Sequence, residues 1–160
     1  MATITKLGIP DPSNQLGASP YGNLTAFRYV LKTVASGAVE GGDSTAAVAS
    51  GDTVKTGLLP AGFRLIDSEV VVKTGMTATI TAKVGFAYAD GVDSTAVPQD
   101  DDFFGTGITV ATAGRYRNAT SNPSVTLPKE AWLTLTTAVA ANAKASELEI
   151  IVFAINEGVA

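Results

Sequence analysis

The sequence predicts an all-β protein, a single jelly-roll-like β-sandwich of about eight strands with an extended N-terminal arm. Residues 76–88 (MTATITAKVGFAY) carry apolar side chains at every second position, the period of a strand with one face in a core. Runs of this kind recur between turn residues, and no convincing segment has the 3.6-residue period of a helix. With 160 residues, 46% of them hydrophobic, the chain can bury one core without disulfides or metals.

Residues 1–22 predict the extended arm. Pro10, Pro12 and Pro20 lie among glycine, serine and asparagine, which disfavours both a helix and a central strand. Fully stretched, about 20 residues reach on the order of 70 Å, so the arm could cross a neighbouring molecule. A disordered terminus is the alternative. The chain therefore divides into an arm (1–22) and a sandwich domain (23–160).

The strands of the sandwich follow in order. The sequence predicts them at 24–34, 53–58, 63–74, 76–88, 108–110, around Tyr116, and at 124–127, 131–138 and 147–156. In 63–74 the alternation changes phase between Ile66 and Val70, which predicts a β-bulge or a bend across a sheet corner. Gly75 separates 63–74 from 76–88, so these two strands are expected to form a hairpin.

Two segments depart from simple alternation. Residues 147–156 (ELEIIVFAIN) become apolar on both faces, which predicts a strand covered on each side. Residues 89–107 are too long for a plain connection and predict a functional or interface loop.

Composition excludes several classes of function. The net charge is −4 and the largest basic cluster is Arg115–Arg117, so we expect no nucleic-acid partner. No apolar run approaches the roughly 20 residues that span a bilayer, so we expect no membrane partner. The chain has no cysteine and no histidine, which removes the thiol nucleophile, the commonest general base and the commonest transition-metal ligand. We therefore expect a protein without a cofactor that is not an enzyme.

Acidic residues leave two alternatives open. Asp90, Asp93 and Asp100–Asp102 could gather oxygen ligands for calcium, or they could belong to a solvated, turn-forming loop. A glycosidase would need two facing carboxylates, for which Asp67, Glu69, Glu147 and Glu149 are the candidates. Their neighbours in the sequence place these four at strand edges or on solvent faces.

Low charge points to assembly, and several aromatic residues are candidates for an interface. Only 16% of residues are charged, and the cores of interfaces are depleted in charge. Phe103 and Phe104 either pin their loop to the core or anchor a partner. Trp132 lies on the threonine face of its strand, so it is an interface residue, a sugar-stacking platform or a residue packed under a loop or the arm. The candidate interface residues are Ile9, Pro10, Pro12, Pro20, Tyr21, Phe103, Phe104, Arg115, Tyr116 and Trp132.

A run of turn and strand patterns resembles a known family. Residues 59–66 (LPAGFRLI), the strand 70–74, the threonine-rich strand 79–85 and the aspartate-rich loop 90–104 occur in this order in the jelly-roll decoration, or cement, proteins of tailed bacteriophage capsids. The resemblance covers residues 57–137, about half of the chain.

The resemblance implies a structural virion protein that binds the outside of a phage capsid and stabilises contacts between capsomers. It further implies a homotrimer, a major capsid protein as partner, assembly in the host cytoplasm and an arm that reaches neighbouring subunits. Two alternatives remain: a carbohydrate-binding or adhesin-like module, in which Trp132 and Tyr116 stack on sugars, and another virion part such as a head fibre base or a tail component.

Overall fold

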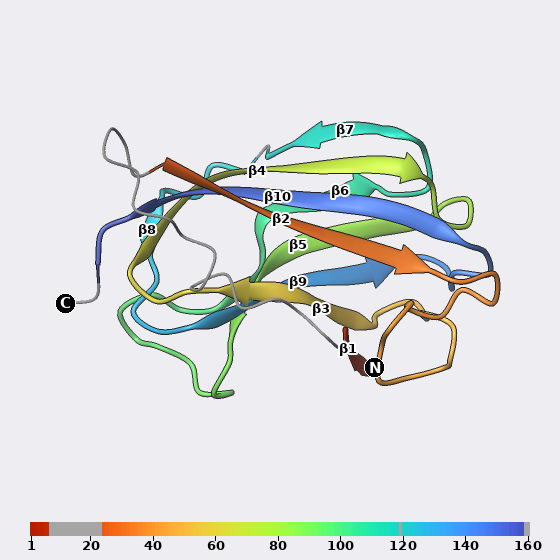
Figure 1. The fold of residues 1–160 in the computed structure, drawn as a ribbon, viewed down its shortest axis with the longest axis horizontal. Coiled ribbons are helices and arrows are strands. Elements are labelled where there is room, and N and C mark those ends of the chain that lie inside the picture. The colour runs from red at the N-terminus through yellow and green to blue at the C-terminus, as the bar shows by residue number, and fades with distance from the viewer. Residues whose placement is uncertain (7–23, 119, 159–160) are drawn as a thin grey trace.

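The strands form two sheets that lie face to face (Figure 1). The computed structural model describes residues 1–6, 24–118 and 120–158, and every regular element in them is a strand. One sheet has the order β1-β3-β9-β5-β6 and the other the order β2-β10-β4-β7, with β8 beside β4. The strands are β1 (Thr3–Thr5), β2 (Leu24–Thr33), β3 (Thr53–Leu59), β4 (Phe63–Thr74), β5 (Thr81–Tyr88), β6 (Asp100–Thr109), β7 (Gly114–Arg117), β8 (Val125–Thr126), β9 (Ala131–Ala138) and β10 (Ser146–Asn156).

The topology is that of a jelly-roll-like sandwich. Apart from the short β1 and β8, eight strands make two four-stranded sheets, and the chain crosses repeatedly from one sheet to the other. Strands far apart in the sequence become neighbours: β10 pairs antiparallel with β2, and β9 pairs antiparallel with β3. The predicted fold class is confirmed, with ten strands in the described ranges where the sequence predicts about eight.

Alternate residues of the strands fill the space between the sheets. In β9 the predicted core residues Ala131, Leu133 and Leu135 are fully buried, while Trp132 and Thr136 are half-buried on the other face. This period of two holds because successive side chains of a strand point to opposite faces. The largest fully buried side chains include Phe86, Phe104, Leu31, Leu65, Leu133 and Leu148.

Of the two alternatives for the phase change in β4, a bulge or a bend, the structure shows the bulge. Leu65 pairs with Ala154 of β10 and Asp67 pairs with Phe153, so Ile66 is the extra residue without a partner in the ladder. The extra residue shifts the buried phase from Phe63 and Leu65 to Ser68, Val70 and Val72.

The hairpin expected around Gly75 is wrong. β4 and β5 lie in different sheets, and β5 begins only at Thr81. Thr79 has a φ of 74°, which breaks the extended backbone, although Met76 and Ile80 stay buried as predicted. A Cβ on Gly75 would lie 2.1 Å from the Ala111 carbonyl oxygen, so this glycine permits a close backbone contact where we predicted a hairpin turn.

The long loop expected at 89–107 is also wrong in its second half, because β6 begins at Asp100. β6 pairs with β5 through two irregularities: Phe86 faces Asp100, but Val84 faces Gly105. This wide bulge holds Asp101–Phe104 and turns Phe103 and Phe104 into the core.

The predicted boundary of the arm needs correction at its start. β1 pairs in parallel with β3, and Ile4 is fully buried in the core. The first six residues therefore belong to the sandwich. The remainder of the expected arm, from residue 7, lies outside the described residues.

Candidate interaction surfaces

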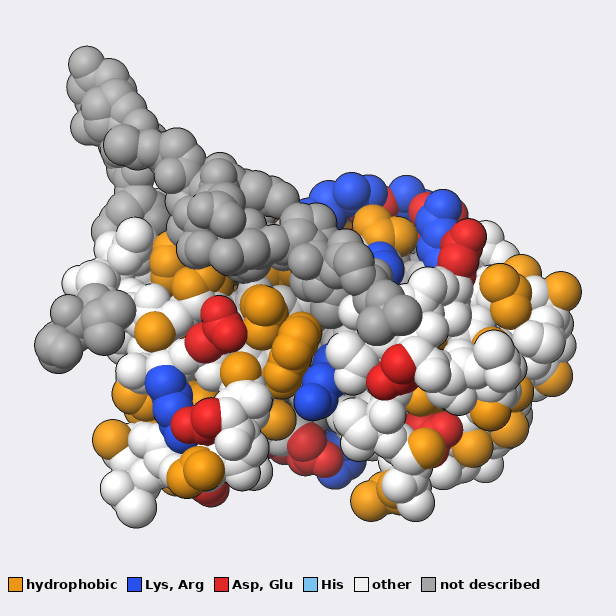
Figure 2. All heavy atoms as spheres, turned by 60° about the horizontal axis from the view of Figure 1, so that its bottom comes forward, with side chains coloured by type: hydrophobic (Ala, Val, Ile, Leu, Met, Phe, Trp, Pro, Cys, Tyr) orange, Lys and Arg blue, Asp and Glu red, His pale blue; other side chains and the backbone are white. Residues whose placement is uncertain are grey.

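The surface is poor in charge and carries no large field of one sign on the face drawn in Figure 2. There, small acidic and basic clusters alternate among hydrophobic and uncharged side chains. Such a surface costs little to desolvate, because few charged groups must leave water.

Trp132 occupies the outer face of the first sheet. It pairs with Leu58 of β3 on one side and with Ala87 of β5 on the other, so three half-buried apolar residues form a row across the sheet. The Lys55 ammonium lies 5.3 Å from the centre of the indole ring. One face of the ring is thus already in contact with the protein.

Next to this row the face is threonine-rich. Thr53 and Thr136 share a hydrogen bond of 2.9 Å between their hydroxyl oxygens. Thr134 is buried, and among the described residues its hydroxyl has no hydrogen-bond partner.

Three aspartates gather at the bulge of β6. The carboxylate oxygens of Asp100, Asp101 and Asp102 lie within 4.8 Å of one another. The hydrogen bond with Asp100, burial and the Asp100 charge raise the pKa of Asp102 above its ordinary value. Lys83 lies 3.4 Å from Asp101 and 4.0 Å from Asp102, so it offsets part of this negative charge.

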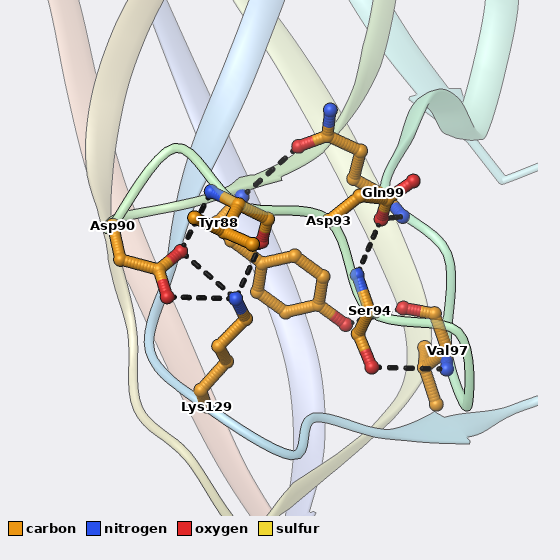
Figure 3. Close-up of polar contacts among 8 residues, drawn as sticks. Tyr88, Asp90, Asp93, Ser94, Val97, Gln99 and Lys129 are labelled. Atoms are coloured by element: carbon orange, nitrogen blue, oxygen red, sulfur yellow. Dashed lines mark hydrogen bonds and ion pairs between the residues drawn. The ribbon is translucent and has the colours of Figure 1, made fainter.

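The other two aspartates of the calcium hypothesis have structural roles (Figure 3). Asp90 forms an ion pair with Lys129 at 2.7 Å, which holds the pKa of Asp90 below its ordinary value. Asp93 accepts hydrogen bonds from the backbone amides of Ser94 and Gln99, both at 2.7 Å. These contacts fit the alternative in which the aspartates form turns.

The same network fastens the segment 89–99 to the sandwich. The Lys129 ammonium also donates to the Val92 carbonyl and lies 4.6 Å from the centre of the Tyr88 ring (Figure 3). The Tyr88 hydroxyl donates to the Val97 carbonyl. Burial raises the pKa of Tyr88, so this hydroxyl keeps its proton and remains a donor.

The outer face of the second sheet carries ion pairs that cross its strands. Glu149 of β10 bonds Arg28 of β2 and Lys73 of β4, and these bonds lower the pKa of Glu149 to about 2. Glu147 pairs with Lys32 at 3.6 Å and with Lys73 at 3.1 Å.

The remaining carboxylates considered for a glycosidase are paired in the same way. Arg115 binds Glu69 at 2.9 Å, and Arg117 binds Asp67 at 2.6 Å. A glycosidase needs two carboxyl groups that face each other across the substrate, and these carboxylates are instead bound to neighbouring cationic side chains. The four residues therefore work as links between strands.

Sequence reasoning missed an apolar patch on this face. The patch lies at one end of the sheet and consists of Leu24, Ala26, Ile66, Ile151, Phe153 and Ile155. Leu24 is 63% exposed and Ile66 is 41% exposed. The apolar run in 147–156 was the sequence signal for this patch. We predicted that β10 is covered on both faces, but its outer side chains are only half-buried among the described residues, so that prediction is wrong.

The structure separates the predicted interface residues. Phe103 and Phe104 are 6% and 1% exposed, and their rings pack edge to face with centres 5.0 Å apart, so they belong to the core and are withdrawn as interface candidates. Tyr116 packs against the core from β7, its hydroxyl donates to the Thr112 carbonyl, and Arg115 beside it is exposed.

Trp132 and Tyr116 lie on strands of different sheets, so they do not form a joint sugar platform. Ile9, Pro10, Pro12, Pro20 and Tyr21 lie outside the described residues. In the described part of the chain, no helix is long and apolar enough to cross a membrane.

Comparisons with known proteins identify the fold. No protein-family model matches this chain, and no curated protein matches its sequence. A chain in the solved capsid of Ralstonia phage GP4 is similar in structure with a TM-score of 0.66 and 18% identity, covering 99% of this chain and 100% of that one. A chain of the cyanophage Pam1 capsid asymmetric unit has a TM-score of 0.59 and 16% identity, covering 93% and 98%. The chain thus shares its β-sandwich fold, over nearly its whole length, with chains found in phage capsid structures.

Proposed function

We propose that this chain is a structural protein of a phage virion. The observation that carries the proposal is the likeness in fold to a chain of the Ralstonia phage GP4 capsid, which extends over 99% of this chain and all of the other. A fold alone does not dictate a function, so the surface must agree with it. It does: the charge-poor faces, the Trp132 row and the outer apolar patch suit packing against other subunits.

Within the virion, we propose the role of a decoration protein on the outside of the capsid, bound to the major capsid protein as a homotrimer. Two observations support this role: residues 57–137 resemble decoration proteins in sequence, and the fold is similar to that of chains in phage capsid structures. The carboxylates considered for catalysis are tied up in ion pairs, which favours a mechanical role over a chemical one.

The mechanism is the addition of contact area where capsomers meet. An interface of standard size buries roughly 1,600 Å² in total. A trimer that holds several shell subunits at once gains avidity, because each later contact is intramolecular. Pressure from the packaged DNA must then break several contacts at the same time before the capsomers separate.

The test is binding to empty shells of the phage that carries the gene. We expect the purified protein to sediment with the shells and to appear as density on their outer surface in cryo-electron microscopy. Absence of binding, or density at a tail or fibre base, would refute the decoration role.

The predicted arm is tested with two variants in the same assay. Deleting residues 1–22 would also remove β1 and its buried Ile4, so we replace residues 7–13 or residues 14–22 with a glycine-serine stretch of equal length. We expect a folded oligomer in both cases, with loss of shell binding in at least one. Unchanged affinity in both variants would exclude the arm from the contact.

A further inference from the structure

Residues 139–145, which connect β9 to β10, form an exposed tip built almost entirely of apolar residues. Their sequence is VAANAKA, in which Lys144 is the one charged residue. Val139 is 66% exposed, and three of the four alanines are exposed as well. Exposed turns are usually rich in glycine, proline, asparagine, aspartate and serine. A tip of valine and alanine gains little from contact with water, so its composition suits contact with another surface.

Hydrogen bonds hold this tip in one shape. Asn142 is 1% exposed, and its side-chain amide donates to the Thr33 hydroxyl at 3.0 Å and to the Lys144 carbonyl at 2.9 Å. Its side-chain oxygen accepts from the Thr77 amide at 3.1 Å. Val139 has a φ of 79°, a conformation that a β-branched residue rarely adopts. The tip is therefore preorganised, and binding through it loses little conformational entropy.

An apolar pocket of about 320 Å³ lies at the other end of the sandwich. Its apolar lining includes Phe86, Val97, Pro98, Phe103, Pro123 and Val125. Phe86 and Phe103 are buried, and the centres of their rings lie 5.4 Å apart. Asp100 also lines the pocket, and the carboxylates of Asp101 and Asp102 lie within 4.8 Å of its own. The pocket is thus apolar inside and acidic at its rim.

The tip cannot fill the pocket of its own chain. β9 ends at Ala138, which pairs with Thr81 at the start of β5. Phe86 of the pocket lies five residues further along β5, about 17 Å away. In Figure 1 the turn that follows β9 and the segment that follows β5 lie at opposite ends of the sandwich.

We propose that the tip of one copy of this chain inserts into the pocket of a second copy. Val139 fills the apolar interior, and the Lys144 ammonium lies against the aspartates at the rim. The charges are complementary, because the three aspartates share one cationic partner, Lys83, in the part of the chain that the structure describes. The two surfaces lie at different ends of the molecule, so the contact is head-to-tail and is completed when the copies close into a ring.

The inference rests on the homotrimer of the proposed function and names the contact that forms it. Self-association is measured on the isolated protein, and decoration is measured on shells. The two proposals therefore fail separately.

The chain has no cysteine, so introduced thiols report the contact directly. We co-express a Val139→Cys copy with a differently tagged Val97→Cys copy and expect a short bismaleimide to link the two. Val139→Cys with Val92→Cys is the matched control. Val92 is exposed on the same segment as Val97, but it is not among the described residues that line the pocket. Equal yields from both pairs, or a link mainly between two Val139→Cys copies, would overturn the proposal.

Glycine at position 139 separates assembly from stability. Glycine adopts a φ near 79° without strain, so Val139→Gly should not lower the melting temperature. The change removes the side chain that fills the pocket, so we expect self-association to weaken at least about tenfold in analytical ultracentrifugation. Val92→Ala is the control, because it also shortens an exposed valine and should leave self-association unchanged.

Three outcomes would contradict the contact. The first is unchanged self-association in Val139→Gly, and the second is an unmodified chain that stays monomeric. The third is a loss of shell binding in Val139→Gly without a loss of self-association, which would assign the tip to the shell instead.

Discussion

At the scale of single residues, close contacts to glycine decide the path of the chain. An added Cβ at Gly85 would lie 2.1 Å from the Asp100 carbonyl oxygen and 2.4 Å from the Asp101 carbonyl carbon. Such distances are far below van der Waals contact, so only glycine allows the β6 bulge to cross β5 here. The bulge in turn places Phe103 and Phe104 in the core.

Gly85→Ala should therefore lower the free energy of unfolding by about 2–4 kcal/mol. This is more than most overpacking substitutions cost, because the added methyl group would meet backbone atoms, which cannot move aside as a flexible side chain can. Denaturant unfolding measures this free energy. Gly105→Ala is the control: its Cβ would approach only the flexible end of Ile108, at 3.0 Å, and should cost about 1 kcal/mol or less. Similar losses in both variants would contradict the role given to Gly85.

At the scale of elements, ion pairs join the strands of the second sheet. The Glu149 side chain is only 10% exposed, and it is held by Arg28 on one neighbouring strand and Lys73 on the other. A carboxylate removed from water in this way needs its partners, because an unpaired buried charge is costly. The three residues therefore tie β2, β10 and β4 together.

This linkage predicts an acid dependence of stability. The folded-state pKa of Glu149 is about 2, below its ordinary value of 4.5, so its contribution is present above about pH 5 and is lost as the pH falls toward 2. We expect Glu149→Gln to flatten the melting temperature against pH between 2 and 5. Glu130→Gln is the control, since Glu130 is exposed and forms no ion pair within the described ranges. An unchanged acid slope in Glu149→Gln would contradict the linkage.

Which strands pair could not be predicted from local sequence. The bounds of 63–74 and 131–138 were predicted correctly, and so was the change of phase after Ile66, because period and phase are properties of the residues themselves. The hairpin at Gly75 was wrong because β4 finds its partners in β10 and β7, far away in the sequence. The first part of β6, from Asp100, was not predicted, because its aspartates and its bulge interrupt the alternation of apolar and polar residues.

At the scale of the whole molecule, the outer faces are where assembly would act. The Trp132 row and the outer apolar patch lie on opposite sheets, so one subunit could contact different neighbours on its two sides. Aromatic residues often dominate binding energy at such surfaces.

Trp132→Ala should weaken shell binding by at least about tenfold while the fold persists, because the side chain is half-buried on an outer face. Sedimentation with shells measures the affinity, and circular dichroism checks the fold. Thr136→Ala on the same face is the control. Analytical ultracentrifugation of both variants should show three times the chain mass. Unchanged shell affinity in Trp132→Ala would remove this row from the interface.

The sequence by itself determined the all-β class, most strand positions and the low charge of the surface. Alternation and composition can be read from the residues without knowing which strands pair. Only the tertiary structure decided that Phe103 and Phe104 are core, that the acidic residues of β4 and β10 are paired links, and that Trp132 and Tyr116 lie on separate sheets. Those outcomes depend on which distant strands meet, and strand pairing is set by packing across the whole sandwich.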